Sequence, residues 1–189
     1  MQQSGTAWRP WAVVAAILAF QAAALYAMGQ PVICECGTVR LWNGVVASAE
    51  NSQQISDWYS FSHIIHGILF YAVLHLLAPG IPVLWRLAIA LGIEVSWEIL
   101  ENSPIIINRY RQSALAAGYS GDSILNSLFD SLFAAFGFLL ASRLKPWQSV
   151  AFVVAAELFV GTMIRDNLTL NIIQLAHPSE ALSRWQGRN

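Results

Sequence analysis

Five separate stretches of about 20 mostly apolar residues dominate this chain, and each is long enough to cross a roughly 30 Å hydrocarbon core as a helix. Only 11% of the residues are charged and 56% are hydrophobic, whereas about a quarter of the residues of a soluble domain are charged. We therefore predict an all-α fold, a polytopic membrane helix bundle of about five transmembrane helices with a polar interior. The predicted spans are 9–28, 60–78, 83–100, 123–141 and 147–164.

The segments between the apolar stretches contain the Gly, Pro and charged residues that end helices. We predict loops at 29–59 and 101–122 in a single membrane domain, 1–189. The C-terminal segment, 165–189, has an apolar part too short to span, so it either extends the fifth helix or lies at the interface. The first stretch is interpreted as an uncleaved span, because it is longer than the roughly 7–15 apolar residues of a signal peptide.

The net charge and the positions of the basic residues indicate where the protein is located and which partners it can bind. The net charge of −1 and the lack of a basic stripe argue against a nucleic-acid partner. We expect a multi-pass protein of the bacterial inner membrane, with membrane lipid as its surroundings and with an oligomeric state that the sequence does not indicate. The overall Lys and Arg count favours an amino terminus outside the cytoplasm. We favour the opposite orientation, because Arg86, Arg143 and Lys145 lie at short, tight loops.

Cys34 and Cys36 are the two cysteines, separated by one residue. This spacing is too close for an ordinary disulfide between them, and two cysteines are fewer than the four ligands of a structural zinc site. We expect two thiols in a loop.

Acidic and histidine side chains inside the predicted spans are the feature that most needs explaining. They fall at helical spacing, so each set lies on one face of its helix. The sets are Glu94, Glu98 and Glu101; Asp122, Asn126 and Asp130; and His63 and His66. Four ionised acids near the middle of spans would cost about 10–14 kcal/mol on the insertion scale. We therefore expect the three stripes to face inward and the charges to be offset by protons, cations or a metal.

Imidazoles and carboxylates that converge are also the ligands of a metal site, and a metal-bound water is a nucleophile at neutral pH. The candidate divalent metals for such a site are Zn, Mn and Mg. The predicted metal ligands are His63, His66, Glu94, Glu98, Asp122 and Asp130. The predicted catalytic residues are Glu98, Asp130 and His66, and the predicted substrate-binding residues are Arg109, Arg111 and Asn126.

The sequence favours an intramembrane hydrolase or group-transfer enzyme that acts on a lipid or a lipid-linked anionic substrate. Arg109 and Arg111 are suited to its carboxylate or phosphate. Two other classes stay open. Chains of buried acids and histidines also mark ion or proton transporters. The same stripes could serve helix packing in a non-catalytic envelope protein, in which Asp122 would be a helix N-cap.

Four segments stand out as motifs, and they carry a resemblance. They are DWYSFSHIIHG at 57–67, EVSWEILEN at 94–102, GDSILNSLFD at 121–130 and RDNLTLN at 165–171. Together they resemble a family of small uncharacterised multi-pass inner-membrane proteins of bacteria over nearly the whole chain. More distantly, the order is similar to VanZ-like proteins, which tend to have glycines where this chain has Asp130. The resemblance implies the fold and a role in the cell envelope, and it implies no reaction.

Overall fold

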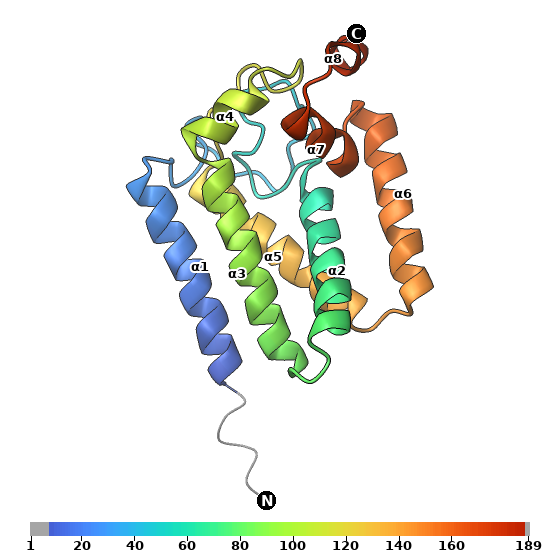
Figure 1. Ribbon diagram of the computed structural model, residues 1–189. Coiled ribbons are helices and arrows are strands. Elements are labelled where there is room, and N and C mark those ends of the chain that lie inside the picture. Colours follow the sequence, from blue (N-terminus) through green and yellow to red (C-terminus); the bar gives the residue numbers. More distant parts are fainter. Residues whose placement is uncertain (1–7, 188–189) are drawn as a thin grey trace, which may run out of the picture.

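The computed structural model describes residues 8–187 of the protein. Over this range the chain is helical, and the only strand-like pairing is an isolated bridge between Asn43 and Asp57. The helices are arranged as a bundle with further short helices and loops at one end (Figure 1). They are α1 (Arg9–Ala27), α2 (Ser60–Leu77), α3 (Val83–Glu101), α4 (Pro104–Tyr110), α5 (Ile124–Ala141), α6 (Pro146–Ile164), α7 (Leu168–Ala176) and α8 (Glu180–Gln186).

The predicted helical membrane bundle is confirmed. Among the described residues, four helices are long and apolar enough to cross a membrane, namely α1, α2, α5 and α6. On α1 and α6 many large apolar side chains, such as Phe20, Trp147 and Leu158, are exposed. Apolar surface of this extent is expected where lipid is the solvent.

Helix α3 has the length of a span but carries several charged residues. It lies beside α1 and α2 and also contacts α5 (Figure 1). Glu94 and Glu98 are completely buried in these contacts, and Arg86 is buried as well. The charged face of α3 therefore points into the bundle, as lipid requires of such a stripe.

Helices α2 and α5 form the most extensive contact in the bundle. Their backbones approach closely where Gly67 faces the Ala134 carbonyl and Gly137 faces the Ile64 carbonyl. A Cβ atom at either glycine would overlap the opposing backbone. Small residues of this kind are the usual means by which membrane helices pack tightly. The crossing fixes His63 and His66, which precede Gly67, relative to Asp130 on α5.

Two details differ from the loop predictions. The predicted loop 101–122 contains the short helix α4, which starts at Pro104, a residue that is favoured at the first helical position. In the loop 29–59, the expectation of free thiols is wrong, because Cys34 and Cys36 form a disulfide. The chain turns tightly there, with Gly37 at φ 75°, and brings the two Cα atoms to 5.1 Å. That separation is within the range that a disulfide spans.

Helix α7 is a separate element and does not continue α6. The chain breaks at Arg165, which adopts a left-handed conformation, and Asn167 caps the new helix at Leu170 N. Glu157 of α6 accepts hydrogen bonds from the backbone N–H groups of Leu168 and Thr169, each at 3.0 Å. A carboxylate at a helix amino terminus satisfies free N–H groups and the helix dipole. Glu157 thus holds α7 across the end of the bundle.

Candidate functional site

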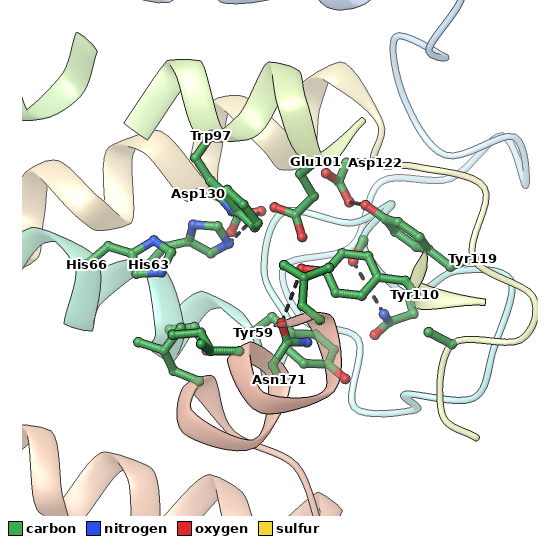
Figure 2. A pocket seen from close by; sticks show the side chains of 17 residues that line it. Tyr59, His63, His66, Trp97, Glu101, Tyr110, Tyr119, Asp122, Asp130 and Asn171 are labelled. Atoms are coloured by element: carbon green, nitrogen blue, oxygen red, sulfur yellow. Dashed lines mark hydrogen bonds and ion pairs between the residues drawn. The ribbon is translucent and has the colours of Figure 1, made fainter. Parts of the chain in front are cut away.

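A cavity of about 310 Å³ lies at the end of the bundle that carries α4 and α7. Its walls come from α2, α3, α4, α5 and α7, together with the loops around residues 51–52 and 116–122. Figure 2 shows histidines and Asp130 at one end of this cavity and tyrosines with Glu101 and Asp122 at the other. The two ends have different chemistry, and we describe them in turn as the histidine end and the tyrosine end.

His63 is the centre of the histidine end. Its Nδ1 lies 2.6 Å from Glu94 Oε1 and 3.3 Å from Glu98 Oε1. On its other side, Nε2 lies 3.8 Å from Asp130 Oδ2. Three helices therefore bring one imidazole and three carboxylates together, all of them buried. The predicted inward convergence of the stripes is what the structure contains, while the chemical roles of these residues stay predictions.

His66 completes a possible metal-ligand set. Its Nδ1 lies 3.1 Å from Glu94 Oε2, so Glu94 contacts both imidazoles. One ligand atom from each of His63, His66 and Glu94 lies within 4.8 Å of the others. A second set, of His63, Glu98 and Glu101, meets the same limit. Two histidines and a carboxylate form the protein ligands of many catalytic zinc and non-haem iron sites.

A polar chain behind Glu98 fixes its orientation. Ser127 donates to Glu98 Oε2 at 2.5 Å. Gln21 of α1 donates to Ser127 Oγ and accepts from Ser131, both at 2.9 Å. All of these groups are fully buried. Glu98 is thus held by α1 and α5, and its Oε2 is not free to turn toward the cavity.

Two buried carboxylate oxygens in the described part of the chain have no hydrogen-bond partner. They are Glu98 Oε1 and Asp130 Oδ1. Asp130 lines the cavity, and its residue is only 5% exposed. Burying a carboxylate oxygen without a hydrogen-bond partner costs free energy, and for this reason most buried polar groups are hydrogen-bonded. The feature points to a proton, an ion or a ligand that the cavity accommodates.

At the tyrosine end, Asp122 is held by two donors. Asn102 Nδ2 donates to Oδ2 at 2.7 Å, and the Tyr119 hydroxyl donates to Oδ1 at 2.8 Å. Burial raises the pKa of Asp122 to about 6, and these two hydrogen bonds offset only part of that effect. Burial beside Asp122 likewise raises the pKa of Tyr119 well above 10, so the phenol stays protonated. Asp122 is not the N-cap of α5, because Ser123 takes that position.

The predicted substrate-binding residues do not line the cavity. Arg109 donates to the backbone carbonyls of Leu175 and Ala176, and Arg111 donates to the carbonyl of Tyr119. These contacts tie α4 to α7 and to the loop before α5. Asn126 is buried and donates to the Gln54 carbonyl at 2.8 Å. Their role in binding a substrate stays a prediction, and the contacts observed are ones that hold the walls together.

Several residues of the cavity were not singled out from the sequence as site residues. Tyr59, Tyr119 and Asn171 come from loops or short helices whose positions are set only by the three-dimensional fold. Glu101 belongs to the predicted acidic stripe but is not among the predicted catalytic or metal-binding residues, yet it lines the cavity. Gln21, an amide within the first apolar stretch, was the available signal for the buried polar chain behind Glu98.

Comparisons with known proteins identify the family of this chain. Residues 25–188 match the family described as "Protein of unknown function (DUF2585)". The UPF0314 protein of Sphingopyxis alaskensis is 57% identical over 93% of this chain and 94% of its own length. That of Rhizobium meliloti is 52% identical over 90% of this chain and 86% of its own.

No solved structure matches the chain, and the distant likeness to VanZ-like proteins stays a prediction. The resemblance to small bacterial proteins without a known function is confirmed by these matches. On the extent and identity of the matches, this chain belongs to the DUF2585 family, to which the description of unknown function applies as a whole.

Proposed function

We propose that this protein is a metal-dependent hydrolase of the bacterial inner membrane that cleaves an ester bond in a lipid or lipid-linked substrate. One observation carries the proposal. His63, His66 and Glu94 bring their ligand atoms together beside a cavity that Asp130 also lines, and Asp130 Oδ1 has no hydrogen-bond partner. A cluster whose only role was to stabilise the fold would not require a carboxylate oxygen without a hydrogen-bond partner on the wall of a cavity.

The spacing of the three ligands fits a divalent ion of the zinc or manganese class. Ligands about 2.1 Å from a tetrahedral metal lie roughly 3.4 Å from one another. His66 Nδ1 lies 3.1 and 3.3 Å from the two Glu94 oxygens, close to this separation, while the His63 Nδ1 to Glu94 Oε1 distance of 2.6 Å has to widen by about 0.8 Å. A metal would also offset part of the buried negative charge, which His63 and His66 alone cannot balance.

A metal ion bound there would make its water acidic enough to act as a nucleophile at neutral pH. Asp130 lies across the His63 ring from Glu94, on the Nε2 side, where it lines the cavity. It would take one proton from such a water where the water extends into the cavity. The water oxygen would then bond to the phosphorus or acyl carbon of the ester, and the bond to the leaving alcohol oxygen would break. The proton would pass from Asp130 to that oxygen, so water and ester would give an alcohol and an acid.

The cavity opens, in this proposal, on the periplasmic side of the membrane. Arg143 and Lys145 lie in the connection between α5 and α6, and Arg86 lies in the first turn of α3. Both of these segments are at the end of the bundle away from α4 and α7 (Figure 1). Positive charge in short loops marks the cytoplasmic side. The Cys34–Cys36 disulfide lies at the cavity end, and disulfides persist in oxidising compartments such as the periplasm. Alkaline phosphatase fused after Ser142 should be inactive and, fused after Gly187, active; the reverse pattern would overturn this orientation.

The metal site is tested by metal content. Protein purified in detergent, loaded with Zn²⁺ or Mn²⁺ and desalted, is expected to retain one ion per chain by mass spectrometry of the metal. Glu94→Gln and His66→Gln should lower the affinity for the metal roughly tenfold or more. Glu50→Gln is the matched control, because Glu50 pairs with Arg40 in the loop 29–59 and does not line the cavity.

The outcomes separate the candidate functions. Metal retention by the wild type and by Glu50→Gln, with loss in both site variants that elute normally, supports the hydrolase. No retained metal in any variant overturns the metal-dependent mechanism. Proton-coupled flux in proteoliposomes without hydrolysis of any lipid would instead favour a transporter. If neither flux nor hydrolysis were detected, the stripes would be assigned a role in helix packing.

A further inference from the structure

The tyrosine end of the cavity has a composition that the hydrolytic chemistry does not use. Tyr110 and Tyr119 stand edge to face with ring centroids 5.5 Å apart. The Tyr110 hydroxyl donates to Asn171 Oδ1 at 3.2 Å and lies within hydrogen-bonding reach of Glu101. Figure 2 shows the Glu101 carboxylate turned into the cavity between the histidines and these rings. Aromatic faces and carboxyl groups together form an acidic box with aromatic walls.

No positive side chain balances this box. Neither a lysine nor an arginine is among the residues that line the cavity within the part of the chain that the structure describes. The two imidazoles can supply at most two positive charges to the acids in and behind the walls, which include Glu94, Glu98, Glu101, Asp122 and Asp130. A divalent ion at the histidine end would leave the acids of the tyrosine end without a cation, so a second cationic group is favoured there.

We infer that the tyrosine end binds the ammonium group of an amine-bearing headgroup, so that the substrate is an amino lipid. This inference rests on the proposed function and names its substrate class. A cation within about 6 Å of an aromatic centroid is attracted by the ring, and the attraction grows in a desolvated site. Glu101 and Asp122 supply the acidic groups, and Asp130 Oδ1, at the histidine end of the same cavity, is a buried acceptor without a hydrogen-bond partner.

The remaining wall explains why the amine belongs to a lipid. Leu168, Ile172 and Leu175 of α7 line the cavity opposite the acids, and Trp97 of α3 also lines it. Ile172 is also half exposed at the surface, at 53%. An apolar strip that continues from a polar cavity to the surface of a membrane helix bundle suits the glycerol and first methylenes of an acyl chain.

The experiment measures headgroup preference in the intact, detergent-solubilised protein by native mass spectrometry. The probes are dioctanoyl phosphatidylethanolamine, dioctanoyl phosphatidylglycerol and soluble phosphoethanolamine, each with metal-loaded and metal-stripped protein. We expect the ethanolamine lipid to bind about tenfold or more tightly than the glycerol lipid in both metal states. Phosphoethanolamine should bind more weakly than its lipid, since it lacks the apolar part; equal binding would assign the site to a free amine.

Substitutions at the tyrosine end test which residues cause the headgroup preference. Tyr110→Leu removes a ring face and Glu101→Gln removes a charge, and each should reduce the preference about fivefold or more. Tyr110→Phe keeps the ring and is the matched control that should retain it. Equal binding of the two lipids to the wild type overturns the inference even if metal binding and hydrolysis hold. Conversely, a headgroup preference in protein that retains no metal after loading with Zn²⁺ or Mn²⁺ would leave the inference standing and overturn the proposed metal-dependent hydrolysis.

Discussion

Gly67→Ala is expected to prevent the protein from folding to its native bundle, with a loss of at least about 3 kcal/mol in the free energy of unfolding. The added Cβ would overlap the Ala134 carbonyl, which belongs to the backbone of α5 and cannot turn away as a side chain can. Overpacking against side chains typically costs 1–3 kcal/mol, and separating two helix backbones removes contacts along the whole crossing. Gly137→Ala should act in the same way, against the Ile64 carbonyl.

Thermal unfolding in detergent, with size-exclusion chromatography, measures this effect. Gly92→Ala is the matched control, because Gly92 is also inside a helix but a Cβ there meets nothing within 4 Å. That change should be neutral or stabilise the protein by up to about 1 kcal/mol, as alanine is the better helix former. Similar melting temperatures for the Gly67 and Gly92 variants would show that α2 and α5 do not cross as described.

Asp130→Asn is expected to reduce hydrolysis of the dioctanoyl phospholipid probe roughly 10²–10⁴-fold, the usual contribution of a general base. The amide has the size of the carboxylate but cannot take a proton from water. Because Asp130 is not one of the three proposed metal ligands, the variant should retain its metal. The product alcohol and acid are measured by mass spectrometry at fixed metal and detergent concentrations.

The control for this change is Glu50→Gln, which removes an acid paired with Arg40 in the loop outside the cavity. Its rate should equal that of the wild type. If Asp130→Asn were equally active, with a higher melting temperature, Asp130 would be a destabilising buried acid without a catalytic role.

The bundle was largely predictable because lipid imposes a strong and simple constraint on sequence. The predicted spans 60–78 and 123–141 differ from α2 and α5 by one residue at one end. Prolines and glycines at the ends of the apolar stretches made this possible. The same constraint made the inward face of α3 predictable, since Glu94 and Glu98 share one side of a helix and could not face acyl chains.

The tyrosine end could not be predicted in this way, because its residues lie outside the spans. The positions of Tyr110 and Tyr119 depend on how α4 and the following loop fold over the bundle, and hydrophobic periodicity says nothing of that. Arg109 shows the converse. Its charge suggested an anion site, but in the structure its guanidinium satisfies free carbonyl groups at the carboxyl end of α7. The sequence shows a positive charge at this position, but it does not show whether the guanidinium binds a ligand or the free carbonyl groups at a helix end.

The contact between Gln21 and Ser127 sets an order of assembly during synthesis. The two residues are 106 positions apart, and the amide of Gln21 has its partners on α5. When α1 leaves the ribosome, those partners do not yet exist, so a bare amide would have to enter the bilayer alone. The first helix is therefore expected to remain beside the insertion machinery until the later helices arrive, so that the bundle closes around its amino-terminal segment last.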